Sequence, residues 1–95
     1  MSVLDNEPLS NEHAQKLIRE VLKNGTVFFT THAQKAMADD QVSTPDVENL
    51  LRAGWVEMSE YENGEWRYRV RTQKLCAIVA FESEAELTIV TVWRF

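Results

Sequence analysis

The sequence has little cysteine, proline or glycine, the residues that form the disulfides and tight turns of small secreted domains. Its 95 residues include one cysteine, two prolines and three glycines. The single cysteine, Cys76, excludes an internal disulfide, which suits a reducing compartment. No apolar run approaches the length that crosses a bilayer, and residues 1–8 lack the hydrophobic region of a signal peptide. We therefore expect a cytoplasmic protein without a membrane segment.

The residues that carry metal, phosphate-loop or serine chemistry are equally scarce. Two histidines far apart and one cysteine do not make a zinc set. The three glycines are isolated turn residues and do not form a phosphate-binding loop. No serine lies in a recognisable nucleophile elbow. We therefore expect no metal and no cofactor.

Positive charge is scarce but concentrated. The formal net charge of −5 and the sequence pI of about 4.9 count against a broad nucleic-acid surface, which normally raises the pI of the whole domain. Half of the ten Lys and Arg residues nevertheless lie from Trp66 onward, where only three acidic residues occur. This asymmetry indicates a local anion site.

Residues 66–71 are typical of a β-strand with one cationic face. Because side chains alternate along a strand, one face carries Arg67, Arg69 and Arg71 and the other carries Trp66, Tyr68 and Val70. Three neighbouring guanidinium groups repel one another unless anions lie among them. Two interpretations remain open. The arginines either clamp phosphate, which their planar forks suit, or pair across a hairpin with Glu57, Glu60 or Glu62.

Apolar spacing predicts helices in the first half of the chain. Residues 1–9 are expected to form a flexible lead-in to a single domain over residues 10–95. Helical periodicity recurs in three segments, which are residues 10–24, 31–40 and 44–53. The expected helix boundaries are marked by Ser10, Thr31 and Thr44 as N-caps and by Gly54 as a left-handed exit.

From Trp55 onward the period is that of β-strands. Four strands are expected, over residues 55–61, 66–71, 75–81 and 87–93, with Asn63-Gly64 as a tight hairpin turn. A further brief strand is expected near Phe28. This order indicates an α+β fold in which the N-terminal helices pack on one face of a four-stranded antiparallel sheet. The opposite face is left for solvent, a ligand or a partner.

Several short sequence motifs resemble those of a small family of mostly uncharacterised bacterial domains. They are Phe29-Thr30-Thr31-His32-Ala33, Val42-Ser43-Thr44-Pro45-Asp46-Val47, Leu51-Arg52-Ala53-Gly54 and the terminal Thr91-Val92-Trp93. The resemblance runs from about Val27 to Trp93. That family is similar to the BrnT and MqsR toxins of the RelE/ParE-like superfamily. The resemblance implies a RelE-like fold and, as in the characterised toxins, a metal-independent ribonuclease neutralised by an antitoxin.

The site residues carry over from this resemblance in part. His32 and Ala33 match the His-Ala pair that opens a helix in the family. Two basic positions that usually follow are Ala36 and Asp40 here, which weakens phosphate binding from that helix. The arginine-bearing middle strand matches in character at residues 67–71.

The candidate catalytic residues are His32, Arg69 and Arg71. Metal-free RNA cleavage needs an acid or base and cations that face the phosphorus. His32 suits the first role because an imidazole titrates near neutrality, although a helix-start histidine bonded to the backbone is an equal interpretation. The candidate binding residues, for phosphate or an acidic partner, are Arg67, Tyr68, Arg94 and Lys74. Core packing is the competing role for Tyr68.

Two functional hypotheses follow from the sequence. The first is a toxin-like endoribonuclease whose arginine strand grips RNA and is covered by an antitoxin. The second is a noncatalytic RelE-like module that uses its arginine face to hold an acidic protein partner or a second copy of the chain. The superfamily resemblance favours the first, and the acidic pI favours the second.

Overall fold

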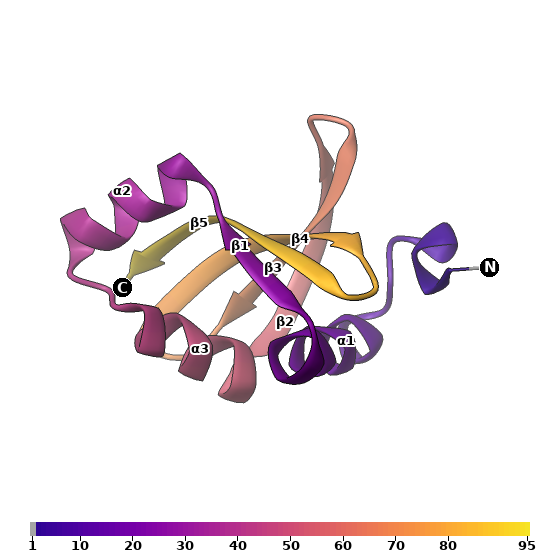
Figure 1. Ribbon diagram of the computed structural model, residues 1–95, viewed down its shortest axis with the longest axis horizontal. Coiled ribbons are helices and arrows are strands. Elements are labelled where there is room, and N and C mark those ends of the chain that lie inside the picture. The colour runs from indigo at the N-terminus through magenta and orange to yellow at the C-terminus, as the bar shows by residue number, and fades with distance from the viewer. Residues whose placement is uncertain (1) are drawn as a thin grey trace.

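The computed structural model describes residues 2–95 and contains three α-helices and five strands (Figure 1). In chain order, the first half comprises a 3₁₀ turn η1 (Val3–Asn6), α1 (Asn11–Asn24), β1 (Thr26–Phe29), α2 (Thr31–Asp40) and α3 (Thr44–Ala53). The second half comprises β2 (Trp55–Glu62), β3 (Glu65–Arg71), β4 (Leu75–Ser83) and β5 (Glu86–Arg94). The predicted α+β class is confirmed.

The sheet differs from the prediction in its first strand. Its order is β1-β5-β4-β3-β2, so β2 to β5 form the expected antiparallel meander. The prediction of a four-stranded antiparallel sheet is wrong, because β1 joins the edge of β5 in parallel and makes a mixed five-stranded sheet. Val27 aligns with Leu87 and Phe29 with Ile89. The brief strand expected near Phe28 is therefore a full member of the sheet.

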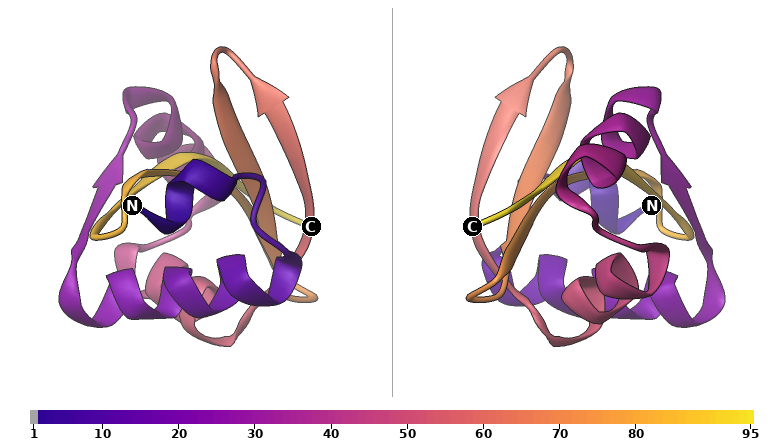
Figure 2. Two further views of the ribbon diagram at one scale, coloured as in Figure 1. Left: turned by 90° about the vertical axis from the view of Figure 1, so that its right-hand side faces the viewer. Right: turned by 90° about the vertical axis from the view of Figure 1, so that its left-hand side faces the viewer.

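Helices α1 and α3 cover one face of this sheet (Figures 1 and 2). Their apolar stripes bury Ala14, Ile18 and Val21 from α1 and Val47, Leu50 and Leu51 from α3. The facing sheet residues include Tyr68, Val70, Val79 and Ile89, all fully buried. Helix α2 packs mainly against β5. The face of β2, β3 and β4 that carries the arginines is thus left without a helix over it.

The helix ends follow local hydrogen bonding, with shifts of one residue from the sequence prediction. Ser10 caps α1 as expected and accepts a hydrogen bond from the backbone N–H of His13 at 3.1 Å. The caps of α2 and α3 are Thr30 and Ser43, one residue before those predicted. Ser43 and Asp46 form a reciprocal capping box, and the hydrogen bonds from Ser43 lower the pKa of the Asp46 carboxyl.

The left-handed position lies at a different helix from the one predicted. Gly54 was expected there, but its backbone is extended, with φ −75° and ψ 171°. A glycine is required at position 54 for steric reasons, because a Cβ would lie 2.5 Å from the carbonyl oxygen of Leu50 and 2.9 Å from that of Arg71. The left-handed residue is Gln41, with φ 56°, at the end of α2. The hairpin turn is confirmed, because Asn63 and Gly64 both have positive φ.

The segment before α1 contacts the domain through Tyr68. The phenol of Tyr68 donates a hydrogen bond to Oε2 of Glu7 at 2.7 Å and accepts one from the backbone N–H of Leu9 at 3.0 Å. Leu9 is itself buried in the core. Residues 7–9 are therefore tied to the middle of β3.

Candidate binding site on the open sheet face

The hairpin register places acids opposite the arginines. Across β2 and β3, Glu60 aligns with Arg67 and Met58 with Arg69. A β-bulge between Val56 and Met58 adds Glu57 to β2 between the positions opposite Val70 and Arg69. The register therefore brings glutamates of β2 within reach of the arginine side chains.

Arg67 and Arg71 are neutralised by glutamates. Nε of Arg67 lies 2.9 Å from Oε2 of Glu65, and its Nη1 lies 3.4 Å from Oε2 of Glu62. Nη1 of Arg71 lies 3.2 Å from Oε1 of Glu57. These pairs agree with the interpretation in which hairpin glutamates offset the cationic strand, and they leave little free charge at either end of it.

Arg71 is also held between aromatic rings. Its guanidinium carbon lies 4.3 Å from the ring centroid of Phe95 and 5.9 Å from that of Trp55. Its Nε donates to the carbonyl oxygen of Thr72 at 3.2 Å. Cation–π contacts and a carbonyl together fix this side chain at the end of the strand farthest from the hairpin turn.

Arg69 differs from both neighbours. Among residues 2–95, no acidic side chain forms an ion pair with it, and its Nε is buried without a hydrogen-bond acceptor. Its guanidinium carbon lies 5.7 Å from the ring centroid of Trp93 on β5. A buried guanidinium N–H without an acceptor is costly. Because solvent barely reaches Nε, an incoming anion would first meet the Nη groups of Arg69 and would bond Nε only after the side chain turns.

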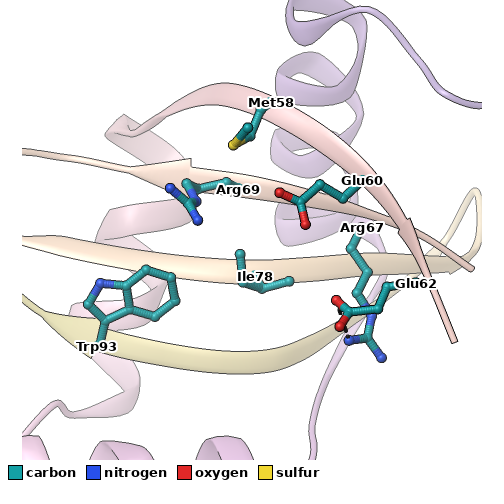
Figure 3. A pocket seen from close by; sticks show the side chains of 7 residues that line it. All are labelled: Met58, Glu60, Glu62, Arg67, Arg69, Ile78 and Trp93. Carbon is teal, nitrogen blue, oxygen red and sulfur yellow. Dashed lines mark hydrogen bonds and ion pairs between the residues drawn. The ribbon is translucent and has the colours of Figure 1, made fainter.

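Arg69 lines a pocket of about 190 Å³ on the open face (Figure 3). Figure 3 shows Arg67 and Glu62 together at one end, with Arg69, Met58 and Trp93 toward the other and Ile78 between them. Glu60 completes the lining. The pocket therefore joins an unneutralised cation, an aromatic ring and aliphatic side chains, a combination that suits a small anionic group with an apolar body.

His32 lines a second hollow next to the first. This hollow, of about 470 Å³, lies between the start of α2 and the hairpin turn and includes Thr30, Asn63 and Thr91. It shares Glu62, Arg67 and Ile78 with the Arg69 pocket. The structure thus brings His32, Arg67 and Arg69 along one hollowed surface, and Arg71 lines neither part of it.

The family model of a domain of unknown function, DUF4258, matches residues 29–94. The chain belongs to the DUF4258 family. The match begins at the last residue of β1 and contains both hollows of the open face. No curated protein and no solved structure shows significant similarity to the chain. The resemblance to a small family of uncharacterised domains is confirmed, and the link to BrnT and MqsR toxins stays a prediction.

The remaining candidates of this DUF4258 domain lie away from the two hollows. Tyr68 points into the core, where burial raises the pKa of its phenol. Arg94 donates from Nε to the carbonyl oxygen of Asp40 at 3.2 Å and from Nη2 to that of Gln41 at 3.0 Å, so it caps the C-terminus of α2. Lys74 is exposed in the turn between β3 and β4.

Cys76 lies beneath the arginine face as a buried small side chain. In the sheet register, Cys76 of β4 is aligned with Arg71 of β3 on one side and with Trp93 of β5 on the other. Burial raises the pKa of its thiol, and the nearby charges of Arg69 and Arg71 offset this only in part. The thiol is therefore protonated at neutral pH, as expected for a packing residue and not for a nucleophile.

Sequence reasoning missed the apolar half of the pocket. The sequence gives no reason to assign Met58 and Ile78 to a site, and Trp93 was considered only as part of a motif that carries the family resemblance. Their common face could be deduced only from the register, which aligns Arg69 with both Met58 and Ile78.

In the described residues 2–95, no group of three metal-ligating side chains and no helix long and apolar enough to cross a membrane is found.

Proposed function

We propose that this DUF4258 domain is a binding module that holds an acidic segment of a protein partner on the open face of its sheet. The observation that carries the proposal is the buried, unpartnered Nε of Arg69 at the pocket between β2 and β5. A carboxylate in the pocket would neutralise the guanidinium, and it would accept the missing hydrogen bond once the side chain turns Nε toward it. An apolar neighbour of that carboxylate would pack on Trp93 and Ile78.

The charges favour a single carboxylate over a polyanion. Arg67 and Arg71 already have glutamate partners, so only one cation of the strand remains unneutralised. Nucleic-acid binding draws its affinity from several phosphate contacts at once. Glu60 and Glu62, which line the pocket and are exposed, would repel every anionic charge beyond the one that Arg69 neutralises. An acidic protein segment needs to bring only one charge to Arg69.

Replacement of Arg69 is expected to weaken the binding of an acidic peptide strongly. The probe is acetyl-Ala-Glu-Phe-Ala-amide, titrated while the NMR signals of the Arg69 Nε–H and the Trp93 indole are followed. Arg69→Gln should weaken binding at least about tenfold, because the pocket loses its cation but keeps most of its volume.

The matched control is Arg67→Gln, which removes an arginine that already has two glutamate partners. It should change peptide affinity less than about threefold, because Arg67 is already engaged by Glu62 and Glu65 and offers little free charge to the peptide. Equal losses in the two variants would contradict a special role for Arg69. Binding that is unchanged in Arg69→Gln would reject the proposed module outright.

A second candidate is a metal-independent endoribonuclease of the toxin type, with an antitoxin as its partner. The observation that favours it is the hollow shared by His32 and Arg67, which continues into the Arg69 pocket. In this mechanism His32 takes the proton of the 2′-hydroxyl group, whose oxygen attacks the phosphorus to form a 2′,3′-cyclic phosphate. The bond to the 5′-oxygen of the next nucleotide breaks, and that oxygen takes a proton from water, while Arg67 and Arg69 face the charge that develops on the phosphate. An antitoxin would silence the enzyme by covering the same face.

RNA cleavage in the presence of EDTA tests this second candidate. His32→Ala should slow cleavage of a labelled single-stranded RNA by about 10²–10⁴-fold, the usual contribution of a general acid or base. Arg69→Ala should also slow it, whereas His13→Ala, in the exposed first turn of α1, should not. Equal cleavage by all four proteins would identify a contaminating nuclease and remove the enzyme hypothesis.

A further inference from the structure

The outer edge of the β2–β3 hairpin is only partly occupied. Strand β2 is the last strand of the sheet, and the hairpin projects beyond the helices (Figures 1 and 2). Side chains of α1 cover the start of this edge. Gln15 accepts a hydrogen bond from the backbone N–H of Val56 at 3.1 Å, and Asn11 donates one to the carbonyl oxygen of Glu57 at 3.2 Å.

The second half of the edge has free backbone groups. Glu62 and Glu65 flank the two-residue turn, so they form a hydrogen-bonded pair, and such pairs alternate along an antiparallel ladder. Ser59 and Tyr61 therefore direct their N–H and C=O groups away from β3. Within residues 2–95, neither residue has another backbone or side-chain partner for these groups. Four backbone hydrogen-bonding groups thus face solvent in one row.

The side chains at this edge protect it only in part. Natural sheets blunt free edges with charged side chains, proline, bulges or short strands, and β2 has a bulge between Val56 and Met58 and an exposed glutamate at position 60. Here Met58 and Tyr61 are 42% and 63% exposed on the two faces of the projecting strand. Tyr61 is oriented by an edge-to-face contact with Trp66, at 5.3 Å between ring centroids. The row of free backbone groups is therefore flanked by large apolar side chains that an added strand could cover.

Charge decides which kind of strand fits. Glu60 lies between the two free residues, is exposed and forms no ion pair among residues 2–95. If two copies of the chain paired through Ser59 and Tyr61, the two-fold axis would place Glu60 directly opposite its own copy. Like charges that face each other across two strands are destabilising. A second copy is therefore disfavoured, and a strand with Lys or Arg opposite Glu60 is favoured.

We propose that residues 58–62 form a strand-addition site for an extended basic segment of a partner protein. The segment pairs antiparallel with β2 through the N–H and C=O groups of Ser59 and Tyr61, and it places a cation against Glu60. The residue opposite Glu60 belongs to a pair without backbone hydrogen bonds, where side chains approach most closely. The site uses the sheet edge and does not rest on the proposed role of Arg69.

Two matched peptides test the proposal, acetyl-Thr-Val-Lys-Val-Thr-amide and the same peptide with Glu in place of Lys. In an NMR titration of the whole chain, the lysine peptide should shift the amide signals of Ser59 and Tyr61. The glutamate peptide should bind about threefold to fivefold more weakly at low salt. Absence of shifts at both amides, or equal affinity for the two peptides, would overturn the proposal.

Two variants separate strand addition from other binding. Ser59→Pro removes one outward N–H without breaking the ladder to β3, which proline tolerates at an edge, and should abolish the shifts at Tyr61. Glu60→Lys keeps every backbone group and should reverse the preference toward the glutamate peptide. A Glu60→Lys protein that still prefers the lysine peptide would contradict the charge argument even if the proline variant folded poorly.

Discussion

Tyr68→Ala is expected to lower the free energy of unfolding by about 3–5 kcal/mol, the usual cost of deleting a buried aromatic side chain. Tyr68 is the largest of the fully buried side chains, and its ring packs edge-to-face on Phe81 at 5.5 Å between centroids. Its phenol also bonds Glu7 and Leu9, so the variant loses both the ring and the tie to residues 7–9. Denaturation by urea, followed by circular dichroism, measures the loss.

Tyr68→Phe separates the phenol from the ring. It keeps the aromatic packing but leaves the backbone N–H of Leu9 without its acceptor, which should cost about 1–3 kcal/mol. The matched control is Tyr61→Phe, because Tyr61 is exposed and its change should lie within about 0.5 kcal/mol. Equal effects of the two Tyr→Phe changes would show that the buried hydrogen bonds contribute nothing.

Alkaline pH adds a second measure of the same phenol. Burial raises the folded-state pKa of Tyr68 above its ordinary value, so above about pH 10 the unfolded chain loses this proton while the folded chain keeps it. The contribution of Tyr68 is therefore fully present below that pH and declines as pH rises further. Tyr68→Phe should lose stability less steeply than the wild type over this range.

Most of the fold was predictable where the pattern was local, although the caps of α2 and α3 were placed one residue late and the left-handed position was assigned to the wrong helix. Helical spacing, the Ser10 cap and the Asn63-Gly64 turn each depend on residues close in sequence, and the structure confirms them. The partner of β1 was not predictable, because a four-residue strand carries no information about which distant edge it joins. Its parallel pairing with β5 depends on α1 and its turn, which bring residues 26–29 beside residues 86–89.

The site was predictable in its residue types but not in its charges. Alternation placed Arg67, Arg69 and Arg71 on one face, and a pairing with hairpin glutamates was foreseen as an alternative. Which arginine remains free depends on the bulge at Glu57, which shifts the register of β2 by one residue. Without that shift, the sequence offers no reason to distinguish Arg69 from its neighbours. The role of Arg94 was not predictable either, because the carbonyl groups that it bonds at the end of α2 lie far from it in sequence.

Gly25→Ala is expected to destabilise the domain by about 3 kcal/mol, at the upper end of the cost of overpacking. A Cβ at Gly25 would lie 2.2 Å from the carbonyl oxygen of Ala85 and 2.9 Å from its carbonyl carbon. Both atoms belong to backbone, so no flexible side chain can move aside. The same carbonyl accepts the N–H of Thr26 at 2.8 Å, so this hydrogen bond must lengthen as the chains separate. Urea denaturation measures the destabilisation.

Gly64→Ala is the matched control, because the two glycines are required for different reasons. A Cβ at Gly64 meets nothing within 4 Å, and its φ of +80° costs an alanine only about 1–2 kcal/mol. A larger loss at Gly64 than at Gly25 would contradict the steric argument. Gly25 immediately precedes β1, and β1 leads into the first turn of α2, where His32 lies. All residues that line the Arg69 pocket come from β2 to β5. In native conditions, Gly25→Ala should therefore impair any chemistry that needs His32 more than it impairs binding at Arg69, which separates the two candidate functions.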